Sequence, residues 1–280
     1  MSPATGPDLQ VVQDVLTETL REFPYNSAVQ FHQFIGLTEQ GPEWGGACPW
    51  QAAHAGDRIA ELTGHEARYV VDGRHVAALF VSDEDVTVVD PYLMHRTAFR
   101  LDRRDPSRAR QSVDAFPLRR RADGTPAPGR TRAEWDEQTQ TLHIEYTRFS
   151  PTRGHNVMSR AFALRLDSQL PGFPPERELI LPLLTHPEQN NLSIRAVLAD
   201  SDEMGEVALP LADRRLIARD NQGAVHHEGS TEFDRIVERV AAAVDHKPTE
   251  VVEHLLEAAE LYDSVAPPGQ ELPAYHAGDE

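Results

Sequence analysis

A change of hydrophobic period at Gly64 constrains the fold more than any other feature of this 280-residue chain. Over residues 49–62 the apolar positions recur at helical spacing, and Gly64 follows where a helix C-terminal cap belongs. Beyond it come three short β-rich runs, 67–71, 75–81 and 86–90, separated by turn sequences. The pattern predicts a helix followed by an antiparallel meander.

The register of the second hairpin in this meander follows from its turn. A turn centred on residues 83–84 pairs Val81 with Val86. The same register sets His75 diagonally across from Asp90 on one face, with β-carbons roughly 7 Å apart. A slip of one residue would destroy this relation, because it moves every side chain to the other face.

The single cysteine, Cys48, excludes an internal disulfide and has a specific predicted position. It follows a glycine-rich stretch, 45–47, and precedes Pro49, and proline is favoured at the first position of a helix. Cys48 is then expected at the N-cap, where the positive end of the helix dipole lowers a thiol pKa. With His75 as base and Asp90 as the group that orients it, Cys48 forms a candidate thiol triad. The alternative is a Cys48 that is only a small buried apolar residue.

Four motifs follow one another in the stretch 45–92. They are Gly45-Gly46-Ala47-Cys48, the helix end and strand from Glu61 to Val70, the strand from Arg74 to Val81, and Val88-Val89-Asp90-Pro91. With these motifs the stretch resembles the core of the transglutaminase-like group of papain-related proteins, and especially the arylamine N-acetyltransferases. The fifteen-residue separation of His75 and Asp90, the chain length and a terminal hairpin and helix are also similar to the acetyltransferases.

This resemblance implies an α+β fold of the papain-like, arylamine N-acetyltransferase-like kind. Its expected parts are an N-terminal helical domain carrying the nucleophile (1–66), a central antiparallel β-barrel carrying the histidine and aspartate (67–200), and a C-terminal α/β lid (201–265). The residues after them, 266–280, are rich in proline and glycine and are expected to be a flexible tail.

The resemblance also implies an enzyme, an N-acyltransferase that forms an acyl thioester on Cys48. The acyl group would pass to a small-molecule amine, as in an amide-forming enzyme of specialised metabolism. The tetrahedral oxyanion would need hydrogen-bond donors. The backbone N–H of Cys48 is the first candidate, with Trp44 and Gln51 as further ones, and for Trp44 the interpretation as a packing residue is favoured.

Departures from the acetyltransferase pattern keep two other functions open. In those enzymes the nucleophilic cysteine begins a Cys-x-Glu-x-Asn motif, which is absent here. In this chain Asp90 is followed by Pro91 and Tyr92, as in transglutaminase-like proteins. A transglutaminase-like amidase or peptidase with the same triad is the alternative enzyme. A catalytically degenerate binding protein that kept the fold is the alternative from another class.

The net charge of −18 argues against a nucleic-acid partner, because it repels phosphates. The charge is uneven: residues 96–132 hold eleven arginines and four aspartates, a local charge of +7. This stretch is either a solvated loop that balances the acidic surface or a docking site for the phosphates of acyl-coenzyme A or an acyl carrier thioester, the expected co-substrate. The candidate docking residues are Arg100, Arg103, Arg104, Arg119, Arg120 and Arg121.

Several other classes of site and location are disfavoured. One cysteine rules out a Cys-rich zinc site, the histidines supply no closed ligand set, and phosphate-binding glycine loops are missing, so neither a metal nor a tightly bound cofactor is expected. No apolar run reaches the roughly 20 residues that cross a bilayer, and the first residues do not read as a signal peptide. We therefore expect a cytoplasmic protein without a membrane partner.

The remaining elements are predicted from periodicity and turn residues. The arginine-rich stretch 102–132 is predicted as long loops with at most one short element. The other predictions are a helix over 8–22, strand-like runs over 141–149, 157–166, 178–184 and 192–198, a hairpin of 215–219 with 224–227, and helices that begin near Ser230 and after Pro248.

Overall fold

The computed structural model describes residues 5–116, 119, 121–150, 153–198, 201, 203–220 and 224–275. The chain forms two compact units, each assembled from separated stretches of sequence. Unit 1 comprises Met1–Leu20, Cys48–Pro117 and Ala127–Phe173, and unit 2 comprises Arg21–Ala47, Leu118–Pro126 and Pro174–Glu280. The two units alternate along the chain, whereas the domains predicted from the sequence are consecutive segments.

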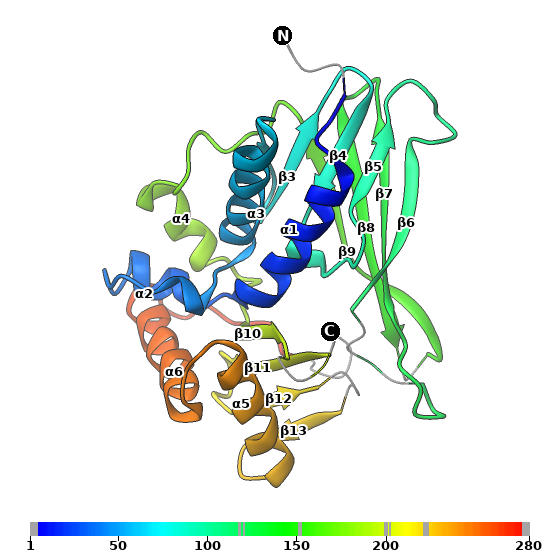
Figure 1. The fold of residues 1–280 in the computed structure, drawn as a ribbon. Helices are drawn as coiled ribbons and strands as arrows, with labels where there is room; N and C mark the ends of the chain where they lie inside the picture. Colours follow the sequence, from blue (N-terminus) through cyan, green and yellow to red (C-terminus); the bar gives the residue numbers. More distant parts are fainter. Residues whose placement is uncertain are drawn as a thin grey trace. The chain divides into compact units, whose positions relative to one another are not determined.

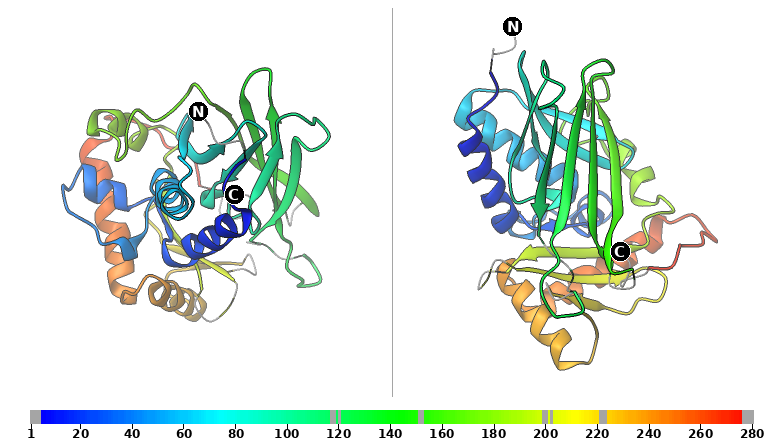
Figure 2. Two further views of the ribbon diagram at one scale, coloured as in Figure 1. Left: turned by 45° about the horizontal axis from the view of Figure 1, so that its top comes forward. Right: turned by 90° about the vertical axis from the view of Figure 1, so that its right-hand side faces the viewer.

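Unit 1 contains two four-stranded antiparallel sheets (Figure 1). The first holds β2 (Arg68–Asp72), β3 (His75–Val81), β4 (Asp85–Val89) and β5 (Phe99–Asp102), and the second holds β6 (Arg110–Ala115), β7 (Gly129–Asp136), β8 (Thr141–Ser150) and β9 (His155–Arg165). The long strands of the second sheet, green in Figure 2, run side by side.

The α+β class is confirmed, but the predicted central barrel is not. Strand β2 lies against β9, and β5 lies against β6 and β7, so the two sheets touch at both edges. Over the described residues, however, the strands hydrogen-bond as two separate sheets and not as one closed cylinder.

The helix that begins at the cysteine packs on the first sheet of unit 1. Helix α3 (Cys48–Thr63) contacts β3. One face of this helix, with Ala52, Ala55 and Ile59, is fully buried. Gly64 ends the helix at φ +73°, a conformation that glycine adopts without the steric cost of a side chain. The predicted helix and the pairing of Val81 with Val86 are both confirmed.

Unit 2 is a five-stranded antiparallel sheet with helices. The strand order is β1 (Tyr25–Asn26), β10 (Asn191–Val197), β11 (Met204–Pro210), β12 (Ile217–Arg219) and β13 (Val225–His227). Helix α5 (Thr231–Ala243) packs on β10, β11 and β12, and α6 (Pro248–Val265) packs on α5 and on α2 (Val29–Phe34). Ser230 caps α5 by accepting a hydrogen bond from the Phe233 N–H at 3.3 Å.

Most of the other predicted elements are confirmed as well. Helix α1 (Leu9–Glu22), which lies in unit 1 through Leu20, matches the prediction for 8–22. Strands β8, β9 and β10, the β12–β13 hairpin and helices α5 and α6 lie where the sequence pattern places them.

Two predictions are wrong. Residues 178–184, expected as a strand, form helix α4 (Arg177–Leu184), because the buried pair Ile180 and Leu184 has helical spacing. The stretch 102–132, expected as long loops with at most one short element, contains two strand segments, β6 and the start of β7. In β7 the alternation that marks a strand is carried by small residues: Gly129, Thr131 and Ala133 are buried between exposed arginines.

A buried ion pair ties three strands of unit 2 together. On β11, Glu206 lies opposite Arg195 of β10 and Arg219 of β12. Its carboxylate hydrogen-bonds Arg219 and lies 3.9 Å from Arg195. Burial raises the pKa of Glu206, but the two guanidinium groups outweigh this effect and hold it below its ordinary value near 4.5.

Replacing Glu206 with Gln is expected to lower the free energy of unfolding by about 3–5 kcal/mol, because two arginines lose a buried carboxylate. The folded pKa of Glu206 is the lower one, so its contribution is complete above about 4.5 and is lost as pH falls through the folded pKa. The difference between wild type and Glu206→Gln, measured by chemical denaturation, should therefore shrink over this acidic range.

Glu203→Gln is the matched control for this measurement. Glu203 pairs with Arg239 at 3.6 Å but is 33% exposed, so its loss should cost under about 1 kcal/mol. An equal loss of unfolding free energy in the two variants would contradict the prediction that the buried ion pair stabilises the fold more than the exposed one.

Candidate active site

Unit 1 brings the three residues of the predicted triad together from three successive elements. Cys48 is the first residue of α3, His75 the first of β3, and Asp90 directly follows β4. The contact of α3 with β3 and the register of β3 with β4 set these positions. All three residues therefore gather at one end of the first sheet.

A short hydrogen bond joins the histidine and the aspartate. His75 Nε2 lies 2.7 Å from Asp90 Oδ2, and the side chains are only 3% and 1% exposed. Because the carboxylate accepts, Nε2 carries the proton, and Nδ1 is the nitrogen left to receive one. His75 Nδ1 is buried and has no hydrogen-bond partner among the described residues.

The thiol of Cys48 lies beside this imidazole. It donates to the backbone carbonyl of Arg74, the residue before His75, at 3.5 Å, and it also interacts with His75. Burial lowers the pKa of His75, but the Asp90 carboxylate and Cys48 outweigh it and raise that pKa well above its usual value. His75 is thus a stronger base than an ordinary histidine.

A second histidine, which the sequence analysis did not single out, holds the aspartate. The backbone N–H of Asp90 donates to His95 Nε2 at 3.1 Å, and His95 Nδ1 donates to the Thr97 carbonyl at 2.8 Å. Burial lowers the pKa of His95, so its neutral form is favoured, and only that form can accept at Nε2. His95 is a positioning residue, and its place five residues after Asp90 was the available signal.

Aromatic rings cover the imidazole of His75. The Phe162 ring on β9 stacks on it with centroids 4.0 Å apart, and the Tyr92 ring lies at 5.2 Å. These rings exclude water from the imidazole, and electrostatic interactions are stronger where water is excluded. Nothing in the sequence pattern pointed to Phe162, because it reaches His75 from the other sheet of unit 1.

The oxyanion candidates fall in different units. Gln51 is buried in the first turn of α3, the helix that begins at Cys48, and the N–H groups of that turn have no acceptor within the helix. Trp44 belongs to unit 2, where it stacks on His246 at 3.8 Å and on His254 at 4.0 Å. Stacking of this kind fits the packing interpretation of Trp44.

Three of the candidate docking arginines lie in unit 1, and each has a carboxylate within 4 Å. Arg103 binds the Glu137 carboxylate with two nitrogens at 2.8 Å and also donates to a backbone carbonyl. The partners are Asp85 for Arg100, Glu137 for Arg103 and Glu84 for Arg104. These pairs account for part of the local excess of positive charge.

The remaining docking candidates lie in unit 2 or outside the described residues. Arg119 is fully buried, and Arg121 donates to the Pro126 carbonyl at 2.6 Å. Arg120 lies outside the described residues. Docking of a phosphorylated donor on these arginines stays a prediction.

Searches of the described residues for metal sites and membrane spans gave no candidates. No group of three or more His, Cys, Asp or Glu side chains in this part of the chain is arranged to hold a metal ion. Among the helices described, none combines the length and the apolar character needed to cross a bilayer.

Comparisons with protein-family models, with curated proteins and with solved structures give no significant match. The resemblance to the acetyltransferases and transglutaminase-like proteins therefore stays a prediction. A site at Cys48 is supported by the geometry of His75 and Asp90 beside its thiol.

Asp90→Asn removes the charge beside His75 with little change in size. Burial then dominates, so the pKa of His75 is expected to fall from its raised value to its ordinary value of 6.5 or below. In wild type the folded pKa is the higher one, so the stabilisation by the pair is complete below 6.5 and is lost as pH rises through the folded pKa.

NMR titration of the His75 ring in isotope-labelled protein would measure this shift directly. His143→Gln, which changes an exposed histidine on β8, is the control and should leave the His75 titration in place. An unchanged titration in Asp90→Asn would show that Asp90 does not control the imidazole.

Proposed function

We propose that this protein is a cysteine-dependent acyl-transfer enzyme that uses Cys48, His75 and Asp90. The observation that carries the proposal is the buried 2.7 Å bond from His75 Nε2 to Asp90, which leaves Nδ1 for the neighbouring thiol. A thiol, a base and an orienting carboxylate are the groups that nucleophilic catalysis at a carbonyl requires. A packing cysteine would need neither a strong base nor a buried carboxylate.

In the first half-reaction the Cys48 thiol passes its proton to His75 Nδ1 and attacks the acyl carbonyl. A carbon–sulfur bond forms, and the carbonyl π electrons move to oxygen. The backbone N–H groups at the start of α3 are the donors available for that oxyanion, and Gln51 lies in the same turn. When the intermediate collapses, the leaving group departs with the proton from His75.

In the second half-reaction an acceptor attacks the Cys48 thioester. His75 Nδ1 takes the proton from the acceptor, the carbon–sulfur bond breaks, and the thiol is restored. Asp90 stays ionised and stabilises the imidazolium in both halves. We propose an acyl thioester as donor and an amine as acceptor, which makes the protein an N-acyltransferase. Water as acceptor would make it an amidase or peptidase with the same groups.

Intact-mass spectrometry after mixing with acetyl-coenzyme A and longer acyl thioesters should show one acyl group on wild type. Cys48→Ala should show none, and Asp90→Asn should accumulate it at least about 100-fold more slowly because its base is misdirected. Adding an arylamine or hydroxylamine to the acyl-enzyme should release the group as an amide faster than water releases the acid. Release to water alone would favour the hydrolase.

The reactivity of the thiol gives a test that needs no acyl donor. At neutral pH, iodoacetamide should alkylate Cys48 at least about tenfold faster in wild type than in His75→Gln, because His75 takes the thiol proton. His143→Gln should react like wild type. Equal rates in all three proteins would favour the catalytically degenerate binding protein.

A further inference from the structure

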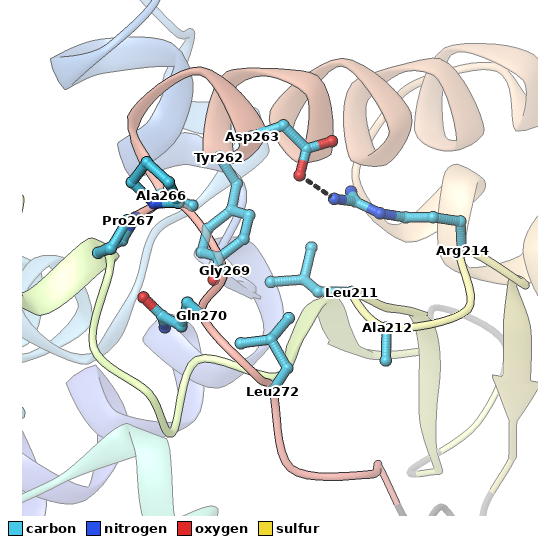
Figure 3. Close-up of a pocket in the computed structure, with 11 residues that line it drawn as sticks. Leu211, Ala212, Arg214, Tyr262, Asp263, Ala266, Pro267, Gly269, Gln270 and Leu272 are labelled. Atoms are coloured by element: carbon cyan, nitrogen blue, oxygen red, sulfur yellow. Dashed lines mark hydrogen bonds and ion pairs between the residues drawn. The ribbon is translucent and has the colours of Figure 1, made fainter.

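A pocket that none of the steps above uses lies in unit 2. Its volume is about 460 Å³, within the range of roughly 300–1,000 Å³ typical of small-molecule sites. The end of helix α6, the turn after β11 and the segment 266–272 form its walls (Figure 3). The segment is held by Gln270, which donates to the Thr185 carbonyl at 3.2 Å.

One polar atom that lines this pocket has no hydrogen-bond partner in the part of the chain that the structure describes. The Tyr262 side chain belongs to a residue only 3% exposed, and its hydroxyl makes no hydrogen bond with any described residue. In Figure 3 its ring extends from α6 toward Gln270 and Leu272. Buried hydroxyl groups are normally hydrogen-bonded, so this one calls for an acceptor. Burial raises the pKa of Tyr262, so the hydroxyl keeps its proton and can donate it.

An ion pair lies at the exposed side of the same pocket. Arg214 donates to Asp263, and the two side chains are 31% and 62% exposed (Figure 3). Arg214 has φ +57°, a left-handed conformation that is uncommon outside glycine and is often found at functional sites. The guanidinium group retains further N–H donors, and the carboxylate retains lone pairs. The pair thus offers one positive and one negative group side by side.

Two leucines, two alanines and two prolines also line the pocket. Leu211 and Leu272 extend into the space in Figure 3, and Pro267 and Ala266 close the wall beside the end of α6. These side chains can cover an aliphatic or aromatic group of a few carbon atoms. Two prolines in succession, Pro267 and Pro268, restrict the backbone of this wall.

We propose that this pocket binds a free α-amino acid with an apolar side chain. The carboxylate of the ligand would contact Arg214 and accept from the Tyr262 hydroxyl, its ammonium group would contact Asp263, and its side chain would lie against Leu211 and Leu272. A zwitterion has no net charge, so the −18 charge of the chain does not oppose its binding as it would oppose an anion. The proposal is independent of the chemistry at Cys48.

Isothermal titration calorimetry on the full chain tests this with L-leucine, L-leucinamide and N-acetyl-L-leucine. Leucine should bind at millimolar concentration or tighter, and the other two, which lack one charge each, should bind at least about tenfold more weakly. Binding of leucinamide or of N-acetyl-leucine equal to that of leucine would overturn the zwitterion assignment. No heat and no shift in melting temperature with leucine would overturn the site.

Two variants of pocket residues and two control variants test whether the signal comes from the pocket. Tyr262→Phe keeps the ring and should weaken leucine binding about fivefold to tenfold with no loss of melting temperature, because no described residue hydrogen-bonds the hydroxyl. Arg214→Gln should weaken it at least about tenfold, whereas Arg215→Gln, an exposed neighbour, should not change it. Cys48→Ala should bind leucine like wild type. Equal affinities in the Tyr262→Phe, Arg214→Gln and Arg215→Gln variants would contradict the proposed mode.

Discussion

The buried hydrogen bond between His75 and Asp90 is the interaction on which the rest of unit 1 depends. A carboxylate without water needs a counter-charge, and a buried imidazole needs a carboxylate if it is to become a cation. The β3–β4 register brings His75 and Asp90 together, and the contact of α3 with β3 places Cys48 beside them. The Phe162 ring covers the imidazole of His75. A chain that required only a stable sheet would place apolar residues at both positions.

Unit 2 also contains a buried carboxylate paired with cationic side chains, but without a neighbouring nucleophile. Glu206 lies between arginines of two flanking strands because antiparallel pairing sets directly opposite residues side by side. There the buried charges link neighbouring strands, whereas in unit 1 the buried charge acts on a base next to a thiol. This contrast is the physical reason for placing the proposed chemistry at Cys48, although Glu206 is equally buried.

Much of the candidate site was predictable because its determinants are local. Pro49 and Gly64 mark the ends of one helix, and the short turn after Val81 sets the register that relates His75 to Asp90. The failures also have a local cause. Apolar residues in 178–184 are too continuous to separate helix from strand. The first three inward residues of β7, Gly129, Thr131 and Ala133, are too small to give a recognisable hydrophobic alternation.

The sequence by itself determined that Cys48 starts a helix and that His75 and Asp90 share one side of a hairpin, since both follow from contacts close along the chain. Only the tertiary structure decided what surrounds them. His95 accepts from the Asp90 backbone and Phe162 covers His75 through packing between elements, and the space next to Tyr262 exists because the segment after α6 turns back on unit 2. Contacts between residues far apart in sequence carry no periodic signature, so pattern alone does not reveal them.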